Sequence, residues 1–256
     1  IYGFLQLSEK RTMMGSKMVV FVTGASGFVG RSALENLLKE GVQIRALTRK
    51  PQLLPISENV TPVHGAFDNM NEWEHKLSGV DVVINVAGEL NEKKMMVEVN
   101  YEGPKRLLEK SIERGVGRWI QLSSVGAYGK VKNGIVTEDW PDNPSGEYEI
   151  SKSKFDAFLR EKSSERAIEA VLLRPTIVYG NGMPNSSLRQ LSQVIRRRMF
   201  VFVGPLDASA NYVHVVDVAN AVCLTLSHPL AAGNTYIISN CQTIKVLVSS
   251  IVVAVS

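Results

Sequence analysis

The stretch Val19–Gly30, which reads VVFVTGASGFVG, decides the fold. Its first four residues form a β-branched and aromatic run, which is typical of a buried parallel strand. A glycine-rich turn follows at once, and a helical pattern then runs from Ser32 to Gly41. Strand, glycine-rich turn and helix in this order are the context that a dinucleotide-binding fingerprint needs. The sequence therefore predicts a nucleotide-binding βαβ unit whose first strand begins near Met18.

The three glycines of this turn have separate tasks in such a fingerprint. Gly24 permits the tight turn, Gly27 lets the backbone approach a pyrophosphate, and Gly30 allows the helix to pack closely on the strand. The N-terminus of the helix offers free N–H groups and the positive end of its dipole to the phosphates. The alternative is an ordinary glycine turn, which the flanking strand and helix patterns disfavour.

The end of the second predicted strand bears on the choice of cofactor. An acidic residue there would bind the ribose hydroxyls of NAD, but the chain continues from Thr48 as Arg49-Lys50-Pro51. Arg49 could clamp the 2′-phosphate of NADP, with Lys50 or Arg45 assisting. A solvated basic loop is the other interpretation. The missing carboxylate favours NADP over NAD.

Apolar segments alternate with helical patterns along the chain. The expected strands lie at 18–23, 42–47, 60–64, 81–86, 117–123 and 169–174. This alternation predicts an α/β fold, a doubly wound parallel sheet of the Rossmann type with helices on both faces and the cofactor across the carboxyl ends of the strands. Ser124 ends the fifth strand at that edge, and the next helix is expected over about Glu147–Lys162.

Tyr148 and Lys152 stand four residues apart, so they share one face of that helix. A phenol titrates near ~10, and an ammonium beside it lowers this pKa, so the tyrosine can exchange a proton with an alcohol or carbonyl oxygen. Such a pair also arises by chance, but here it follows a cofactor loop and Ser124. Ser123 and Ser124 should point to opposite faces of the strand, so only one of them should face the cofactor.

Seven segments in order make the chain resemble the extended short-chain dehydrogenases/reductases, the family that contains nucleotide-sugar epimerases and dehydratases. The resemblance covers roughly Met18–Ser250. The segments are Thr23–Gly30, Gly65–Asp68, Asp81–Gly88, Val99–Gly103, Ile120–Gly129, Leu173–Gly180 and Tyr212–Ala219.

The resemblance implies an enzyme and assigns roles to its residues. The implied catalytic set is Ser124, Tyr148 and Lys152, with Lys152 also bonding the nicotinamide ribose and Asn100 supporting the site. Asp68 would meet the adenine amino group. The expected cofactor-binding residues are Gly24, Ser26, Gly27, Phe28, Val29, Gly30, Arg49, Asp68, Val86, Ala87, Gly88, Tyr148, Lys152, Pro175 and Val178.

The expected reaction is proton transfer coupled to hydride transfer by an NAD(P)-dependent oxidoreductase, epimerase or dehydratase, with a nucleotide sugar as the first choice of small-molecule substrate. The resemblance would place an arginine before Tyr212, where Ala208–Asn211 stands instead. Arg189 or Arg196–Arg198 could replace it. The departure keeps open a carbonyl reductase or a hydroxysteroid-type dehydrogenase. A non-catalytic NADP(H)-binding sensor is the alternative of another class, which the Tyr148–Lys152 pair disfavours.

Composition excludes several classes of partner. The net charge of +4 is spread along the chain, and its one basic cluster, Arg196–Arg198, is too short to predict nucleic-acid binding. The chain has only two cysteines, which favours a reduced, cytoplasmic protein. The histidines do not have the spacing of metal ligands. The apolar segment 246–255 is too short to span a bilayer. We therefore expect no metal and no membrane partner, and a homodimer is compatible with the sequence.

The expected domains are a leader or tag-like arm at 1–17, an NAD(P)-binding Rossmann domain at 18–180 and a small C-terminal substrate lobe at 181–256, with 212–240 returning to the Rossmann domain. The lobe is expected to be shortened or the chain cut. Three polar residues receive weaker predictions. His214 is expected as a hydrogen-bonded core residue, Asp217 as the cap of a helix starting at Val218, and Glu138 either in the substrate cleft or in a solvated loop.

Overall fold

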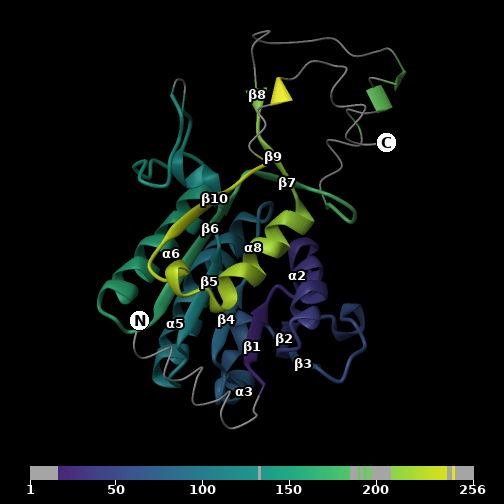
Figure 1. The fold of residues 1–256 in the computed structure, drawn as a ribbon, viewed down its shortest axis with the longest axis vertical. Helices are drawn as coiled ribbons and strands as arrows, with labels where there is room; N and C mark the ends of the chain where they lie inside the picture. Colours follow the sequence, from purple (N-terminus) through teal and green to yellow (C-terminus); the bar gives the residue numbers. More distant parts are fainter. Residues whose placement is uncertain are drawn as a thin grey trace.

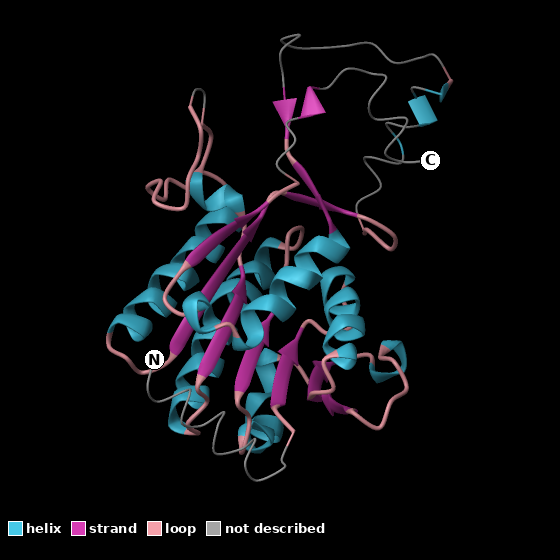
Figure 2. Ribbon diagram, viewed as in Figure 1, coloured by secondary structure: helices cyan, strands magenta, loops and turns pink. Residues whose placement is uncertain are grey.

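The computed structural model describes residues 17–131, 134–184, 190, 193–194, 196–197, 209–240 and 244–245. A seven-stranded parallel sheet lies between two layers of helices (Figures 1 and 2). Its strands, in spatial order, are β10 (Thr235–Ile238), β6 (Glu169–Pro175), β5 (Arg118–Leu122), β4 (Val82–Asn85), β1 (Val19–Thr23), β2 (Gln43–Thr48) and β3 (Val60–His64). This confirms the predicted α/β doubly wound sheet.

The helices and the short strands complete the fold. The α-helices are α2 (Phe28–Lys39), α3 (Met70–Trp73), α4 (Lys93–Val97), α5 (Gly103–Glu113), α6 (Glu147–Ser164) and α8 (Val215–Ser227). A π-helical segment, η4 (Glu98–Glu102), joins α4 to α5. The 3-10 turns are η1 (Pro51–Leu53), η2 (Phe67–Asn69), η3 (Glu74–Leu77), η5 (Val125–Tyr128) and η6 (Pro229–Ala231). β7 (Ile177–Tyr179) pairs with β9 (Tyr212–His214), and β8 (Ser209–Ala210) pairs with β11 (Ile244–Lys245).

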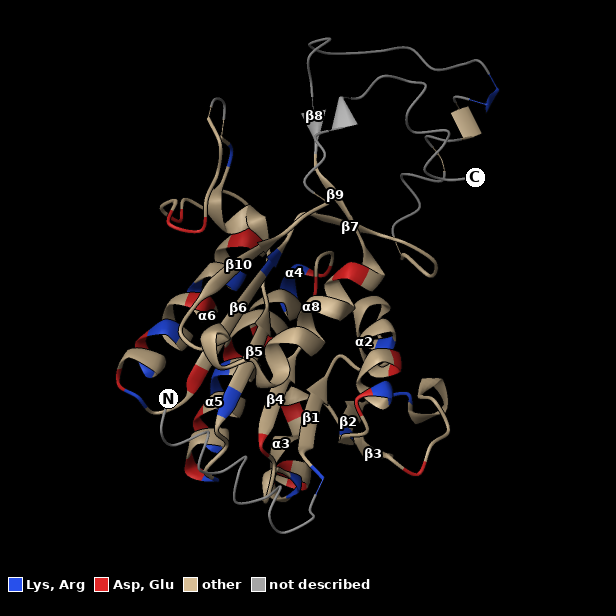
Figure 3. Cartoon of the chain, in the orientation of Figure 1, with Lys and Arg blue, Asp and Glu red and all other residues tan. Residues whose placement is uncertain are grey.

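Each face of the sheet carries its own apolar core, because successive side chains of a strand point to opposite faces. Val20 and Val22 of β1 pack with Leu34 of α2 and Val222 of α8. Phe21, between them in sequence, belongs to the other core, which includes residues of α3, α5 and α6. The central strand β1 is therefore apolar on both sides. Figure 3 shows the charged residues mainly on helices and connecting loops.

The strand order reverses between β1 and β4. β2 and β3 extend the sheet on one side of β1, and β4, β5 and β6 extend it on the other. The connections that leave β1 and β4 therefore depart in opposite directions and open a crevice at the carboxyl ends of these strands, where open α/β sheets bind ligands. The six predicted strands are confirmed to within about two residues at each end.

The start of α8 differs from the prediction. The helix begins at Val215, and its N-cap is His214, whose Nδ1 accepts a hydrogen bond from the backbone N–H of Val216 at 3.4 Å. Asp217 is an exposed residue of the first turn, so the prediction that it caps the helix is wrong. His214 is hydrogen-bonded, as predicted, but it is only half-buried, so the prediction that it belongs to the core is wrong. The uninterrupted apolar run around His214 hid the true helix start.

Several predictions fall on residues outside the described part of the chain. These are the arm at 1–16, Arg189, Arg198, Cys241 and the apolar segment 246–255. Cys223 is a free, half-buried thiol whose pKa burial raises to about 11. Among the described helices, none is long and apolar enough to cross a membrane.

Candidate active site

The turn between β1 and α2 forms a cradle that only glycine fits. Gly24 has a φ of +63°, and a Cβ placed there would lie 2.7 Å from the backbone nitrogen of Ala87 in the loop after β4. A Cβ on Gly30 would collide with the carbonyl oxygen of Gly24. The glycines thus bring the loops after β1 and β4 into backbone contact at the switch point of the sheet.

The N-terminus of α2 faces this cradle without a side-chain cap. Its N-cap, Gly27, has extended backbone and makes no side-chain hydrogen bond, and the first turn holds no acidic residue. The first N–H groups of the helix and its positive dipole end are left for an anion. These features fit the pyrophosphate of a dinucleotide.

A pocket extends from the cradle along the ends of β1, β2, β3 and β4. Five of the expected cofactor-binding residues line it: Gly24, Ser26, Arg49, Asp68 and Ala87. Its other lining residues are Thr23, Leu47, Thr48, Gly65, Ala66, Phe67, Met95, Glu98 and Val99. Met95, Glu98 and Val99 were not foreseen, although their spacing along a helical segment after Gly88 was a usable signal.

The basic residues near the end of β2 divide into two groups. Arg49 is exposed and lines the pocket. Arg45 instead donates hydrogen bonds to the carbonyl oxygens of Lys76 and Ser78, in the segment that precedes β4. That segment lies at the opposite edge of the sheet from the pocket, so the interpretation of Arg45 as an assisting phosphate ligand is wrong.

Lys152 of α6 is buried between the ends of two strands. Its Nζ donates to the carbonyl oxygen of Ala87, after β4, at 2.9 Å and to that of Leu122, in β5, at 3.1 Å. Burial lowers its pKa to about 8, against the opposing effect of Asp156. The site of a Cβ on Gly88 lies 3.5 Å from Lys152 Nζ, so the ammonium borders the loop after β4.

Tyr148 lies one helical turn before Lys152 on α6. Burial raises its pKa to about 12, and the charges of Asp156 and Glu149 add to the rise. The prediction that Lys152 lowers the pKa of Tyr148 is therefore wrong for this arrangement. The ammonium is engaged with two carbonyl oxygens, and desolvation of the phenolate dominates.

The two serines after β5 have different partners. Ser123 is buried and donates from Oγ to Asp156 Oδ2 at 2.6 Å. Ser124 is half-buried, and its Oγ accepts a hydrogen bond from the backbone N–H of Gly126 at 3.0 Å as the N-cap of η5. The hydroxyl of Ser123 is thus used in a buried hydrogen bond to Asp156. The hydroxyl hydrogen of Ser124 can still be donated to another acceptor.

Asn100 supports the site from the π-helical segment. Its side-chain amide donates to the carbonyl oxygen of Glu89 at 2.9 Å and to Ser151 Oγ at 3.0 Å, and its Oδ1 accepts from the backbone N–H of Glu89 at 2.9 Å. Ser151 in turn donates to the carbonyl oxygen of Tyr148 at 2.8 Å. This fully buried amide ties the loop after β4 to the first turn of α6.

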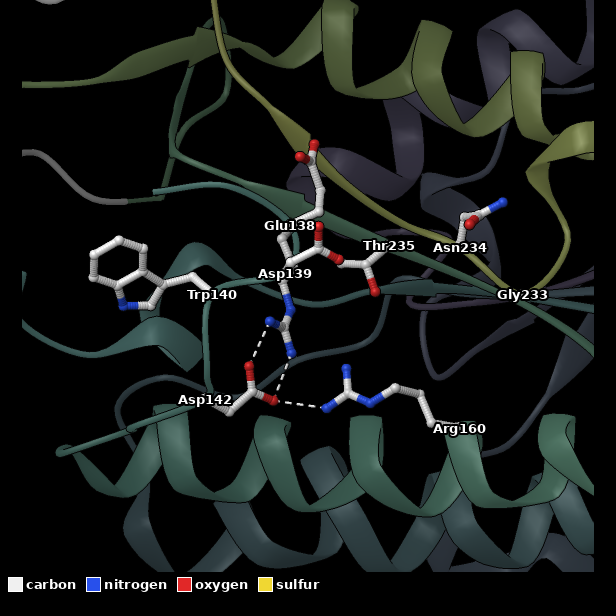
Figure 4. Close-up of a pocket in the computed structure, with 9 residues that line it drawn as sticks. Glu138, Asp139, Trp140, Asp142, Arg160, Gly233, Asn234 and Thr235 are labelled. Atoms are coloured by element: carbon white, nitrogen blue, oxygen red, sulfur yellow. Dashed lines mark hydrogen bonds and ion pairs between the residues drawn. The ribbon is translucent and has the colours of Figure 1, made fainter. Parts of the chain in front are cut away.

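A second pocket lies beside α6 and is shown in Figure 4. Buried Arg174 of β6 makes a bidentate ion pair with Asp142, at 2.6 Å and 2.9 Å, and also contacts Asp156 at 2.9 Å. Arg160 of α6 adds a 2.7 Å contact to Asp142 (Figure 4). Although burial opposes it, hydrogen bonding to Arg174 and Arg160 holds the pKa of Asp142 below its usual value.

Glu138, which was expected either in the substrate cleft or in a solvated loop, lines this second pocket. Its Oε1 accepts a hydrogen bond from the backbone N–H of Ile237 in β10 at 3.1 Å. Glu138 and Asp142 therefore fasten the segment between Ser124 and Tyr148 to the strands β10 and β6.

The remaining expected residues do not line the pocket. Phe28 and Val29 open α2, and Val86 and Gly88 flank Ala87. Pro175 is the buried last residue of β6, and Val178 of β7 packs on the core beside α2 and α8. The described residues contain no group of three or more potential metal ligands.

A family model described as the NAD dependent epimerase/dehydratase family matches residues 20–239. The chain belongs to this epimerase/dehydratase family. This membership agrees with the sequence resemblance to the extended short-chain dehydrogenases/reductases.

Individual members of the epimerase/dehydratase family are distant in sequence. The chain is 24% identical over 227 residues to the 3-beta-hydroxysteroid dehydrogenase of Mycolicibacterium neoaurum, which covers 84% of this chain and 62% of the relative. It is 25% identical over 234 residues to the UDP-glucose 4-epimerase of Vibrio cholerae, covering 86% and 70%. In eight of the curated relatives, the matched part spans between 52% and 72% of the relative's length.

Solved structures of the family share the fold. A dTDP-glucose 4,6-dehydratase from Streptomyces venezuelae with NAD bound superposes with a TM-score of 0.80 at 23% identity, covering 93% of this chain and 81% of that one. At this level of identity the likeness establishes the architecture alone.

Proposed function

We propose that this protein uses Ser124, Tyr148 and Lys152 for proton transfer coupled to hydride transfer on a small-molecule substrate, with a nucleotide sugar as the first choice. One observation carries the proposal: Lys152 Nζ is bonded to the carbonyl oxygens of Ala87 and Leu122 at the carboxyl ends of β4 and β5. This contact draws the first turns of α6 to the end of the dinucleotide pocket, next to Ser124.

Each residue of the set has a role that its surroundings support. With a pKa raised to about 12, Tyr148 stays protonated at neutral pH and can donate a proton to a developing alkoxide. Ser124 hydrogen-bonds the same substrate oxygen and stabilises the charge on it. Lys152 fixes the loops around the site through two backbone carbonyls. The nicotinamide, when bound, supplies the hydride chemistry.

The decisive experiment compares the wild-type protein with Tyr148→Phe. The assay measures turnover of UDP-glucose and dTDP-glucose with NAD or NADP, and calorimetry measures cofactor binding. We expect the variant to lose at least about 10²-fold in kcat because the group that exchanges a proton with the substrate oxygen is gone, while cofactor affinity stays within a factor of about two. Equal turnover by both proteins would refute the mechanism.

For the cofactor we propose a preference for NADP over NAD. The support is that exposed Arg49 lines the pocket at the end of β2 and that no carboxylate follows the strand there. Arg49→Ala should weaken NADP binding about tenfold and leave NAD binding unchanged, because a charged hydrogen bond to a 2′-phosphate is worth about 1.5 kcal/mol or more. Calorimetric titration with both cofactors measures this, with exposed Lys154→Ala as the charge-matched control. A wild-type protein that binds NAD more tightly would overturn the preference.

A hydroxysteroid dehydrogenase is the second candidate. The likeness to a 3-beta-hydroxysteroid dehydrogenase favours it, as does the absence of an arginine from Ala208–Asn211. Turnover of a 3β-hydroxysteroid in preference to the sugar nucleotides would select it. Cofactor binding without turnover of any compound in either class would point instead to the non-catalytic sensor.

A further inference from the structure

Glu149 directly follows Tyr148 in α6, and its side chain fills a slot formed by two glycines. A Cβ on Gly126 of η5 would lie 2.6 Å from Glu149 Cγ, and a Cβ on Gly146 would collide with Glu149 Oε2. Such distances are shorter than any real side chain tolerates. The absence of side chains at Gly126 and Gly146 is therefore what lets the Glu149 carboxylate occupy this position.

The slot lies beside the catalytic serine. The same Cβ position on Gly126 is 3.3 Å from Ser124 Oγ and 3.5 Å from Glu149 Oε1. The hydroxyl of Ser124 and the carboxylate of Glu149 thus both lie close to one point in space. The negative charge of Glu149 also acts on Tyr148, where it adds to the effects of burial and Asp156.

This carboxylate has acceptor capacity to spare. Glu149 is half-buried, and no hydrogen bond or ion pair joins its side chain to the residues that the structure describes. Glu147, two residues earlier on the same turn, pairs at the surface with Lys93 at 2.8 Å. A carboxylate is an acceptor only, so the groups it can bind are hydroxyl, amide or ammonium donors.

We propose that Glu149 is a specificity-determining residue that accepts a hydrogen bond from a hydroxyl group on the carbon next to the one that Ser124 and Tyr148 act on. The inference rests on the proposed function and deepens it by naming the substrate class. A sugar ring offers such a neighbouring hydroxyl. The hydrocarbon skeleton of a hydroxysteroid offers none and would bury the carboxylate without a partner, which is unfavourable. Glu149 therefore selects polyhydroxylated substrates over hydroxysteroids.

The test uses the whole protein with saturating NAD or NADP and two probes, UDP-glucose and a 3β-hydroxysteroid. The variants are Glu149→Gln, Glu149→Leu and the control Glu147→Gln, which removes the same charge from the same helical turn. We expect Glu149→Gln to lower kcat/KM for UDP-glucose about tenfold, mainly through KM, as expected for a lost charge-assisted hydrogen bond. Glu149→Leu should lose more with the sugar nucleotide and gain at least about threefold with the steroid.

A second readout does not depend on turnover. NMR titration of ¹³C-labelled tyrosine, with Tyr148→Phe to assign the signal, should show a lower pKa of Tyr148 in Glu149→Gln than in Glu147→Gln. An unchanged titration would remove Glu149 from the site whatever the substrate is. Unchanged kinetics of Glu149→Gln in an active enzyme would overturn the inference alone, whereas a wild-type protein without turnover of either probe would overturn the proposed function and this inference with it.

Discussion

The sequence spacing predicts the position of Lys152, but burial in the folded protein determines its pKa. Lys152 follows Tyr148 by four residues, so both were predicted to lie on one helix. The structure confirms this, because both residues belong to α6. The spacing does not reveal that the ammonium would be 3% exposed and held by backbone carbonyls, with a pKa lowered to about 8. The burial of Lys152 depends on β4 and β5, which lie far from Lys152 in the sequence, so no local sequence pattern predicts it.

The lowered pKa of Lys152 makes stability depend on pH. Between pH 8 and 10.5 the unfolded chain binds this proton while the folded protein does not, so stability rises with pH across the window. Lys152→Met should lack the rise, which amounts to on the order of 3 kcal/mol. Tyr148, with a pKa of about 12, titrates above the window in the folded protein.

Urea unfolding of both proteins at pH 7.5, 9 and 10.5 measures the difference. We expect the free energy of unfolding of the wild type to rise relative to that of Lys152→Met as pH increases. Parallel pH profiles of the two proteins would show that Lys152 titrates normally.

Strand β6 stabilises the fold through the buried ion pairs of Arg174 as well as through its backbone hydrogen bonds. Arg174 is 1% exposed, contacts two carboxylates and stacks over the ring of Tyr128 at 4.5 Å. Removing one partner of a buried ion pair leaves an uncompensated charge. The segment between Ser124 and Tyr148 depends on this contact for its place.

Arg174→Ala should therefore lower the free energy of unfolding by about 3–5 kcal/mol. Arg160→Ala is the matched control, because it removes the same kind of side chain from the same carboxylate, Asp142, at a partly exposed position. We expect it to cost about 0–1 kcal/mol. Denaturant unfolding compares the two, and similar losses would mean that burial does not set the strength of these pairs.

The ends of helices and strands could be predicted where the residue type changes abruptly along the sequence. β1 and β2 begin and end within about two residues of the predicted bounds, because apolar runs meet glycine or charged residues there. The π-helical turn that presents Asn100 had no such signal. It reflects packing between α4, α5 and α6 and is not specified by local propensity.

On the scale of the whole molecule, the cofactor pocket is assembled by strands that are far apart in sequence. Residues from the ends of β1, β2 and β4 line it together with residues of the α4–η4 segment. Parallel alternation predicted that these strand ends would share an edge. The sequence predicted that residues 212–240 return to the Rossmann domain, but it did not predict that β10, near residue 235, would join the sheet beside β6. That order arises from the chain's return through α8.

A ligand that bridges so many elements should stabilise the fold as a unit. Saturating NAD or NADP, at about 100 times its dissociation constant, should raise the free energy of unfolding by about 2.7 kcal/mol. Gly24→Ala should abolish the increase, because its Cβ would meet the backbone of Ala87.

Gly41→Ala supplies the control for backbone strain. Gly41 has a φ of +70°, close to the +63° of Gly24, but a Cβ there would meet nothing within 4 Å. It should lower stability without changing the increment from the cofactor. Thermal unfolding with and without cofactor measures both, and loss of the increment in Gly41→Ala would contradict the assignment of the cradle.

The bond between Glu138 and the N–H of Ile237 also has a consequence for behaviour at high concentration. β10 is an edge strand, and the outward N–H groups of an edge are templates for pairing with another molecule. Glu138 covers one of them with a side chain that carries charge. The opposite edge, β3, contains exposed Pro62, which has no N–H to offer. Each edge of the sheet thus offers at least one backbone donor fewer for the intermolecular strand addition that leads to aggregation.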